Sequence, residues 1–131
     1  MGERVLFQVV RGEDFSPVIY CHWAGDQVRQ ICTRLRDRMG DRCGDLHYTA
    51  ARLVQECIDG NEGNLSFGIW NATSILTAAD SHGDGGVVLI DVSGPLDASG
   101  PQMRFKCFGG YWITVENDLP KLKWHVEGEA A

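Results

Sequence analysis

The chain has 131 residues, of which 44% are hydrophobic and 23% are charged. This composition is that of a globular protein and excludes an intrinsically disordered one, and the length is typical of one domain. The formal net charge of −6 argues against a surface built for general nucleic-acid binding. We expect one domain over residues 1–126 and a frayed tail over residues 127–131.

The cysteines predict a reducing environment. They are odd in number, widely spaced and mostly flanked by apolar residues, so a disulfide framework is not expected. They are Cys21, Cys32, Cys43, Cys57 and Cys107. The chain shows no signal-peptide pattern and no apolar run of membrane-spanning length, so we expect a soluble, cytoplasmic protein without a membrane partner.

The first strands are predicted from β-branched and aromatic residues. Residues 4–10 and 17–23 are rich in both types, and the turn-like residues 12–16 separate them. Together they predict a β-hairpin.

Two helices follow, because the apolar period changes from two to about 3.6. The first is predicted to be capped by Asp26 and to end at Gly40, and the second to be capped by Asp45 and to end before Gly60. Their short link predicts an αα-hairpin. The arginines fall largely off the apolar stripes and predict a solvent-facing basic island, made of Arg29, Arg34, Arg36, Arg38, Arg42 and Arg52.

The rest of the chain is typical of β-structure. Residues 65–70 and 86–92 predict strands. Residues 71–79 favour a further strand over a short helix, because Thr73, Ile75 and Thr77 continue the two-residue period. In the last hairpin, a three-residue loop at 109–111 gives better cross-strand pairs than a two-residue loop. Residues 122–126 are predicted to form a final edge segment.

The order ββ-αα-βββββ predicts an α+β fold. We expect an antiparallel sheet with the two-helix hairpin packed on one of its faces.

One group of polar residues could carry catalysis. His82 stands beside Asp84 in a glycine-rich segment, and Asp91 follows the next buried stretch. A histidine between carboxylates can act as a general base, with His22 at the first strand-to-helix junction as a further candidate. This pattern allows a small hydrolase or nucleotide-processing enzyme, but a hairpin loop uses the same residue types, and we favour that structural interpretation.

Other residues are candidates for binding. The arginines Arg29, Arg34, Arg36 and Arg38 could hold a phosphorylated nucleotide, which is the hypothesis of a nucleotide-sensing module. The aromatic residues could form a hot spot for a protein partner or a stacking platform for bases. They are Tyr111, on the last predicted loop, and the tryptophans Trp23, Trp70, Trp112 and Trp124. Cys43 and His47 form only one ligand pair, so no metal site and no cofactor are predicted.

Two segments resemble small accessory proteins carried by bacterial phages and prophages, without pointing to a defined family. The segments are Tyr20-Cys21-His22-Trp23-Ala24-Gly25 and Ser81-His82-Gly83-Asp84-Gly85-Gly86-Val87-Val88. The resemblance implies an inhibitor of a host defence system, including the anti-CRISPR kind, that occludes the surface of a host protein. With the acidic charge and no recognised catalytic motif, this favours a non-enzymatic binding protein that does not contact nucleic acid directly. A homodimer stays an alternative.

Overall fold

The computed structural model describes residues 4–22, 27–42, 44–81, 86–93, 96–97, 100–101, 103–108 and 123–126. In chain order the elements are β1 (Val5–Arg11), β2 (Asp14–Phe15), β3 (Val18–Cys21), α1 (Val28–Met39), the 3-10 turn η2 (Gly40–Arg42), α2 (Leu46–Ile58), β4 (Phe67–Trp70), the 3-10 turn η3 (Ala78–Asp80), β5 (Gly86–Asp91), β6 (Leu96–Asp97), β7 (Gly100–Pro101), β8 (Arg104–Phe108) and β9 (Lys123–Val126). The α+β class and the two predicted helices are confirmed.

The main sheet is mixed, which corrects the purely antiparallel prediction. Its strand order is β4-β3-β1-β5-β8-β9, with β2 also paired to β1. The predicted hairpin between β1 and β3 is antiparallel, as are β3 with β4 and β5 with β8. However, β1 pairs with β5 in parallel, and β8 pairs with β9 in parallel. A parallel pair needs a long crossover connection, and the segment between β1 and β5, which holds both helices and β4, provides it.

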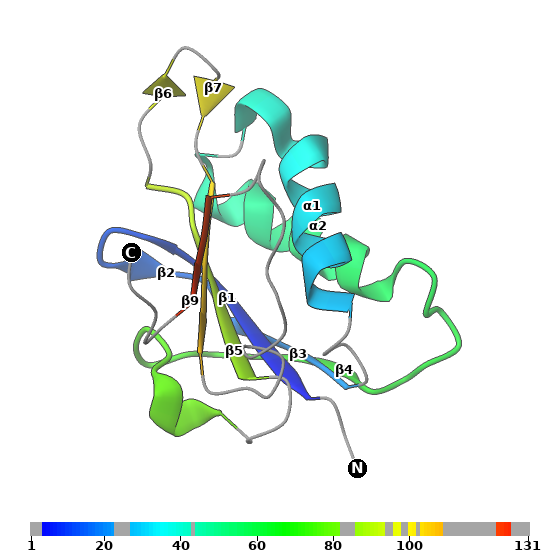
Figure 1. Ribbon diagram of the computed structural model, residues 1–131. Coiled ribbons are helices and arrows are strands. Elements are labelled where there is room, and N and C mark those ends of the chain that lie inside the picture. Colours follow the sequence, from blue (N-terminus) through cyan, green and yellow to red (C-terminus); the bar gives the residue numbers. More distant parts are fainter. Residues whose placement is uncertain are drawn as a thin grey trace.

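Both helices lie together on one side of the sheet (Figure 1). The buried residues of α1 are those of its predicted stripe, including Ile31 and Leu35. The helix α2 buries part of its predicted stripe, including Leu53, but also the polar Thr49 and Glu56, which were not predicted to be buried. The predicted cap of α2 is confirmed, because Asp45 accepts a hydrogen bond of 2.9 Å from the Tyr48 backbone N–H. Gly40 ends α1 with φ of 51°, a conformation that glycine adopts without strain. The predicted Asp26 cap lies outside the described residues.

The sheet buries apolar side chains on both faces. Along β1, Val5, Phe7 and Val9 pack in the core beneath the helices, whereas Leu6 and Val10 pack on the opposite face. This is the two-residue alternation of a central strand. No helix among the described residues is long and apolar enough to cross a membrane.

The segment after β4 covers the face of the sheet that the helices leave open, and it corrects the prediction of a strand over residues 71–79. Apart from η3 it is irregular, and Ile75 and Leu76, although adjacent, both pack on that face. The buried Gln8 of β1 holds it there. Its amide donates to the Ser74 carbonyl at 3.2 Å, and its oxygen accepts from the Leu76 N–H at 2.8 Å. A side chain thus satisfies backbone groups that a strand neighbour would otherwise satisfy.

The end of the chain agrees with the prediction in part. The final segment forms β9 and is the last strand of the sheet order, as predicted for residues 122–126. The predicted loop at 109–111 and the tail at 127–131 lie outside the described residues. The strand pairs predicted across that loop are wrong for Phe105 and Cys107, because β5 and β9 occupy the two edges of β8 at these residues. The short hairpin of β6 and β7 was not predicted.

Candidate functional site

The described catalytic candidates lie at opposite ends of the central strands. Cys21, the neighbour of His22, lies opposite Val5, whereas Asp91 lies opposite Val10 further along β1. At about 3.3 Å per residue, the two ends are ~16 Å apart. His22 and Asp91 therefore do not meet, while His82 and Asp84 lie outside the described residues.

Each of the two described catalytic candidates, Asp91 and His22, has a hydrogen-bond partner two residues away. Asp91 accepts from the Ser93 backbone N–H at 2.8 Å and also contacts the Ser93 hydroxyl. This arrangement is an Asx-type turn that ends β5. The Nδ1 atom of His22 is 2.9 Å from the Tyr20 hydroxyl.

Two arginines of the basic island bind a buried carboxylate. The side chain of Glu56, in α2, is 0% exposed, and those of Arg34 and Arg38 are 41% and 44% exposed. Arg34 donates from Nε to the carboxylate at 3.0 Å and from a terminal nitrogen to the Glu56 backbone carbonyl at 3.0 Å, and Arg38 donates from Nε to the second carboxylate oxygen. Both arginines therefore keep part of their surface in solvent, as predicted, and also join α1 to α2 through Glu56, which was not predicted.

The sequence contains a signal for this cluster that the prediction did not use. Glu56 stands three residues after the buried Leu53, and therefore on the buried side of α2. Arg34 and Arg38 are four residues apart and so share one side of α1. A carboxylate on a buried stripe needs such partners.

The other two arginine candidates also have contacts. Arg36 donates to Asp37 at 3.1 Å, and Arg29 is partly buried on α1. Both make at least one further interaction. Of the aromatic candidates, Tyr111 and Trp112 lie outside the described residues.

The described cysteines are free and buried, which confirms that they serve as small core residues. They are Cys21, Cys32, Cys57 and Cys107. Burial raises the pKa of the Cys32 and Cys107 thiols, and a hydrogen bond with Cys21 together with burial raises that of Cys57. Such thiols are poor nucleophiles and poor metal ligands. Within the described part of the chain, no group of three or more His, Cys, Asp or Glu could hold a metal ion.

The outer strand β4 is the most exposed apolar feature of the described chain. Ile69 is 58% exposed and Trp70 46%, and Leu65, just before the strand, is 93% exposed. In the ladder Ile69 lies opposite Ile19, which faces the helices, and Trp70 lies opposite Val18, which faces the other way. Both faces of the sheet are therefore apolar at this edge.

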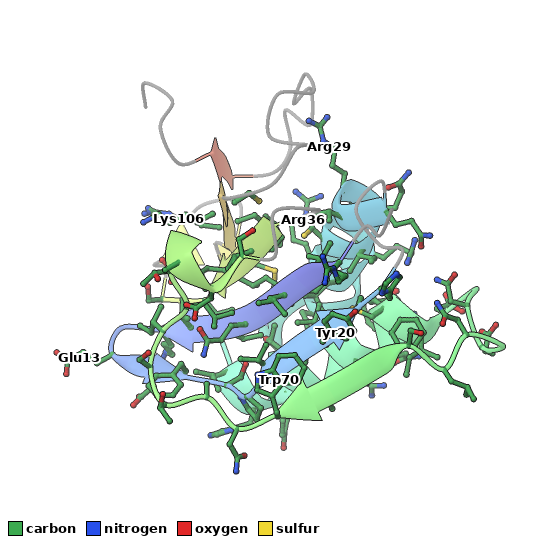
Figure 2. All side chains as sticks on the ribbon, turned by 90° about the horizontal axis from the view of Figure 1, so that it is seen from below. Glu13, Tyr20, Arg29, Arg36, Trp70 and Lys106 are labelled. Carbon is green, nitrogen blue, oxygen red and sulfur yellow. The ribbon has the colours of Figure 1, made fainter. Side chains whose placement is uncertain are left out.

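Each of these two side chains adjoins a further apolar feature. Trp70 lies beside Tyr20, with ring centroids 5.8 Å apart, over β3 and β4 (Figure 2). On the helix side, Ile69 borders an apolar pocket of about 320 Å³ between α2 and the strands. The lining of this pocket includes Ile19, Val54, Ile58 and Phe67. The helix therefore leaves part of the sheet uncovered beside β4.

Of the apolar edge of β4, Trp70 was among the predicted aromatic candidates, but Ile69 and Leu65 were not. A sequence signal was present, because Phe67-Gly68-Ile69-Trp70 holds no charged residue and no proline. Edge strands usually carry charged residues or proline, which oppose pairing with another chain.

No protein-family model, curated protein or solved structure matches the chain.

Proposed function

We propose that this chain is a non-enzymatic binding protein that pairs a strand of a partner protein with the edge strand β4. The observation that carries the proposal is this unprotected apolar edge. Among the described strands, β4 pairs only with β3. Its outward N–H and C=O groups can therefore form a ladder with an added strand.

The side chains around β4 define the chemistry of the partner strand. Alternate residues of an added strand point to opposite faces. One set would extend the layer of Trp70 and Tyr20, and the other would reach the pocket beside Ile69. The partner segment is thus extended and carries apolar side chains on both faces.

Charge favours a partner with a basic surface around that segment. The loop that leads into β4 exposes Asp59 and Glu62, and the whole chain has a net charge of −6. Complementary charge steers association and excludes acidic partners. In the setting implied by the phage resemblance, the partner is a host protein, and the complex inhibits it by occluding its surface. The hydrolase alternative stays a prediction for His82 and Asp84.

Selection of binders from a displayed peptide library tests the proposal. We expect the enriched peptides to be extended and apolar, with flanking Lys or Arg. They should protect the Phe67 and Ile69 amides, whose N–H groups point away from β3, from hydrogen exchange. Ile69→Lys should weaken binding about tenfold or more, because a lysine at an edge opposes strand pairing. Gln30→Lys adds the same charge at an exposed position of α1 and should bind as the wild type does.

Two outcomes would reject this assignment. Peptides that bind Ile69→Lys as tightly as the wild type would show that β4 is not the docking edge. A wild-type dimer in sedimentation that Ile69→Lys converts to a monomer would show that β4 pairs with a second copy instead. Capture of a host protein counts in favour only if a selected peptide competes with it.

A further inference from the structure

A positively charged hollow lies where the two helices meet. Its volume is about 470 Å³, and its lining comes from α1, η2 and α2: Arg38, Met39, Arg42, Tyr48, Ala51 and Arg52. Three arginines thus line one hollow, and no acidic residue is among its described lining residues. The concentration of positive charge is unexpected in a chain with a net charge of −6.

Arg38 is held in place without being neutralised. Its Nε donates to Glu56, which leaves two terminal NH₂ groups for another acceptor. Glu56 also pairs with Arg34, so one negative charge is shared by two positive ones. The cluster therefore keeps a net positive charge at the wall of the hollow.

Arg42 and Arg52 are positioned by uncharged groups. The Arg42 guanidinium carbon lies 4.8 Å from the centroid of the Tyr48 ring. A guanidinium stacked on an aromatic ring keeps its charge. Its N–H donors lie in the guanidinium plane and can bind the oxygens of an oxyanion there. Arg52 donates to the amide oxygen of Gln55 at 2.8 Å and also keeps its charge.

A neighbouring hollow of about 760 Å³ is a weaker candidate. Arg42 lines it too, together with Arg11 and His47, but so do Asp14 and Asp45. The two carboxylates offset the cations there. The excess positive charge is therefore concentrated on the side of Tyr48 and Arg52.

We propose that Arg38, Arg42 and Arg52 bind a phosphate group of a ligand. Guanidinium groups hold phosphate oxygens in pairs, and several converging groups give both charge and direction. The volume lies in the range of small-ligand sites, about 300–1,000 Å³. The phosphate could belong to a nucleotide or to the backbone of a single-stranded nucleic acid. The site is separate from β4 and does not depend on the function proposed for that edge.

Titration calorimetry of the full chain with pyrophosphate, ADP and a short oligothymidylate tests the proposal. At low salt we expect at least one probe to bind with a Kd of about 1 mM or tighter. Arg42→Gln and, separately, Arg52→Gln should weaken binding about fivefold or more, and Arg42→Lys should be intermediate, since lysine keeps the charge but loses the planar fork. Arg104→Gln is the matched control, because Arg104 is exposed on β8 and outside the hollow.

The probes separate the two sources of phosphate. Tighter binding of ADP or pyrophosphate supports a small ligand, and tighter, steeply salt-dependent binding of the oligonucleotide supports nucleic acid. The proposal is overturned if no probe binds, or if Arg42→Gln and Arg52→Gln bind like Arg104→Gln. Thermal unfolding of each variant shows whether it is folded, and Arg52→Gln, altered at an exposed helix position, keeps the test valid should Arg42→Gln unfold.

Discussion

The buried carboxylate of Glu56 gives the sharpest test of how the helices are held together. Replacing Arg34 and Arg38 with Met keeps most of the side-chain volume but leaves the carboxylate without a cation. Breaking a buried ion pair in this way costs about 3–5 kcal/mol, because the remaining charge stays desolvated. Both arginines are more than one-third exposed, so water can reach part of the site and the lower end of that range applies. We therefore expect the double variant to lose ~3 kcal/mol of unfolding free energy.

The two arginines should not contribute equally. Arg34 also donates to the Glu56 backbone carbonyl, one of the last carbonyls of α2, which have no partner within the helix. Arg34→Met should therefore cost about 0.5–1 kcal/mol more than Arg38→Met. Adding Glu56→Met to the double variant removes the buried charge and should restore most of the loss.

Urea unfolding, with the m-value compared across variants, measures these differences. Arg52→Met is the control, because Arg52 is exposed on α2 and donates to the uncharged Gln55, so its loss should change stability by less than about 0.5 kcal/mol. A loss below about 1 kcal/mol in the double variant would refute the reasoning. So would a triple variant that is no more stable than the double.

Three further predictions concern other parts of the molecule. Gln8→Leu should cost about 2 kcal/mol and should speed hydrogen exchange at the Leu76 amide, which would lose its acceptor. Because burial raises the pKa of the Cys32 and Cys107 thiols, neither should react with DTNB at about pH 8 until the protein unfolds, as read by mass spectrometry of labelled peptides. Nearby backbone N–H groups, its own first, lower the pKa of Glu62, so part of the stability should be lost as the pH falls below about 4.5, and Glu62→Gln should remove that part of the decline in acid unfolding curves.

The elements that could be predicted are those that the local sequence defines. The hairpin of β1 and β3 and both helices follow from side-chain period and turn residues, because each element buries one side against its neighbours. The Asp45 cap was predictable for the same reason, since its partner is only three residues away.

The features that could not be predicted depend on residues far apart in the chain. Nothing near Val5 indicates that Gly86 lies beside it in parallel. Thr73, Ile75 and Thr77 continue a strand-like period, but Gln8 satisfies part of this backbone, and no strand of the described residues pairs with it. The same limit applies to the candidate sites. The positions of Arg34 and Arg38 depend on Glu56, and the exposure of Ile69 depends on how far α2 extends over β4.

The position of β1 constrains the order in which the chain can fold. During synthesis, the hairpin with β3 and the two helices emerge before β5, so one side of β1 must wait for a partner 81 residues later, the difference between Val5 and Gly86. Closing so long a loop is slow compared with hairpin and helix formation. Until then the nascent chain exposes two apolar strand edges, β1 and β4, and only the first is covered when β5 arrives. The interval before β5 is synthesised is therefore the period of greatest aggregation risk, and a chaperone that binds extended apolar segments would act on β1 in that interval.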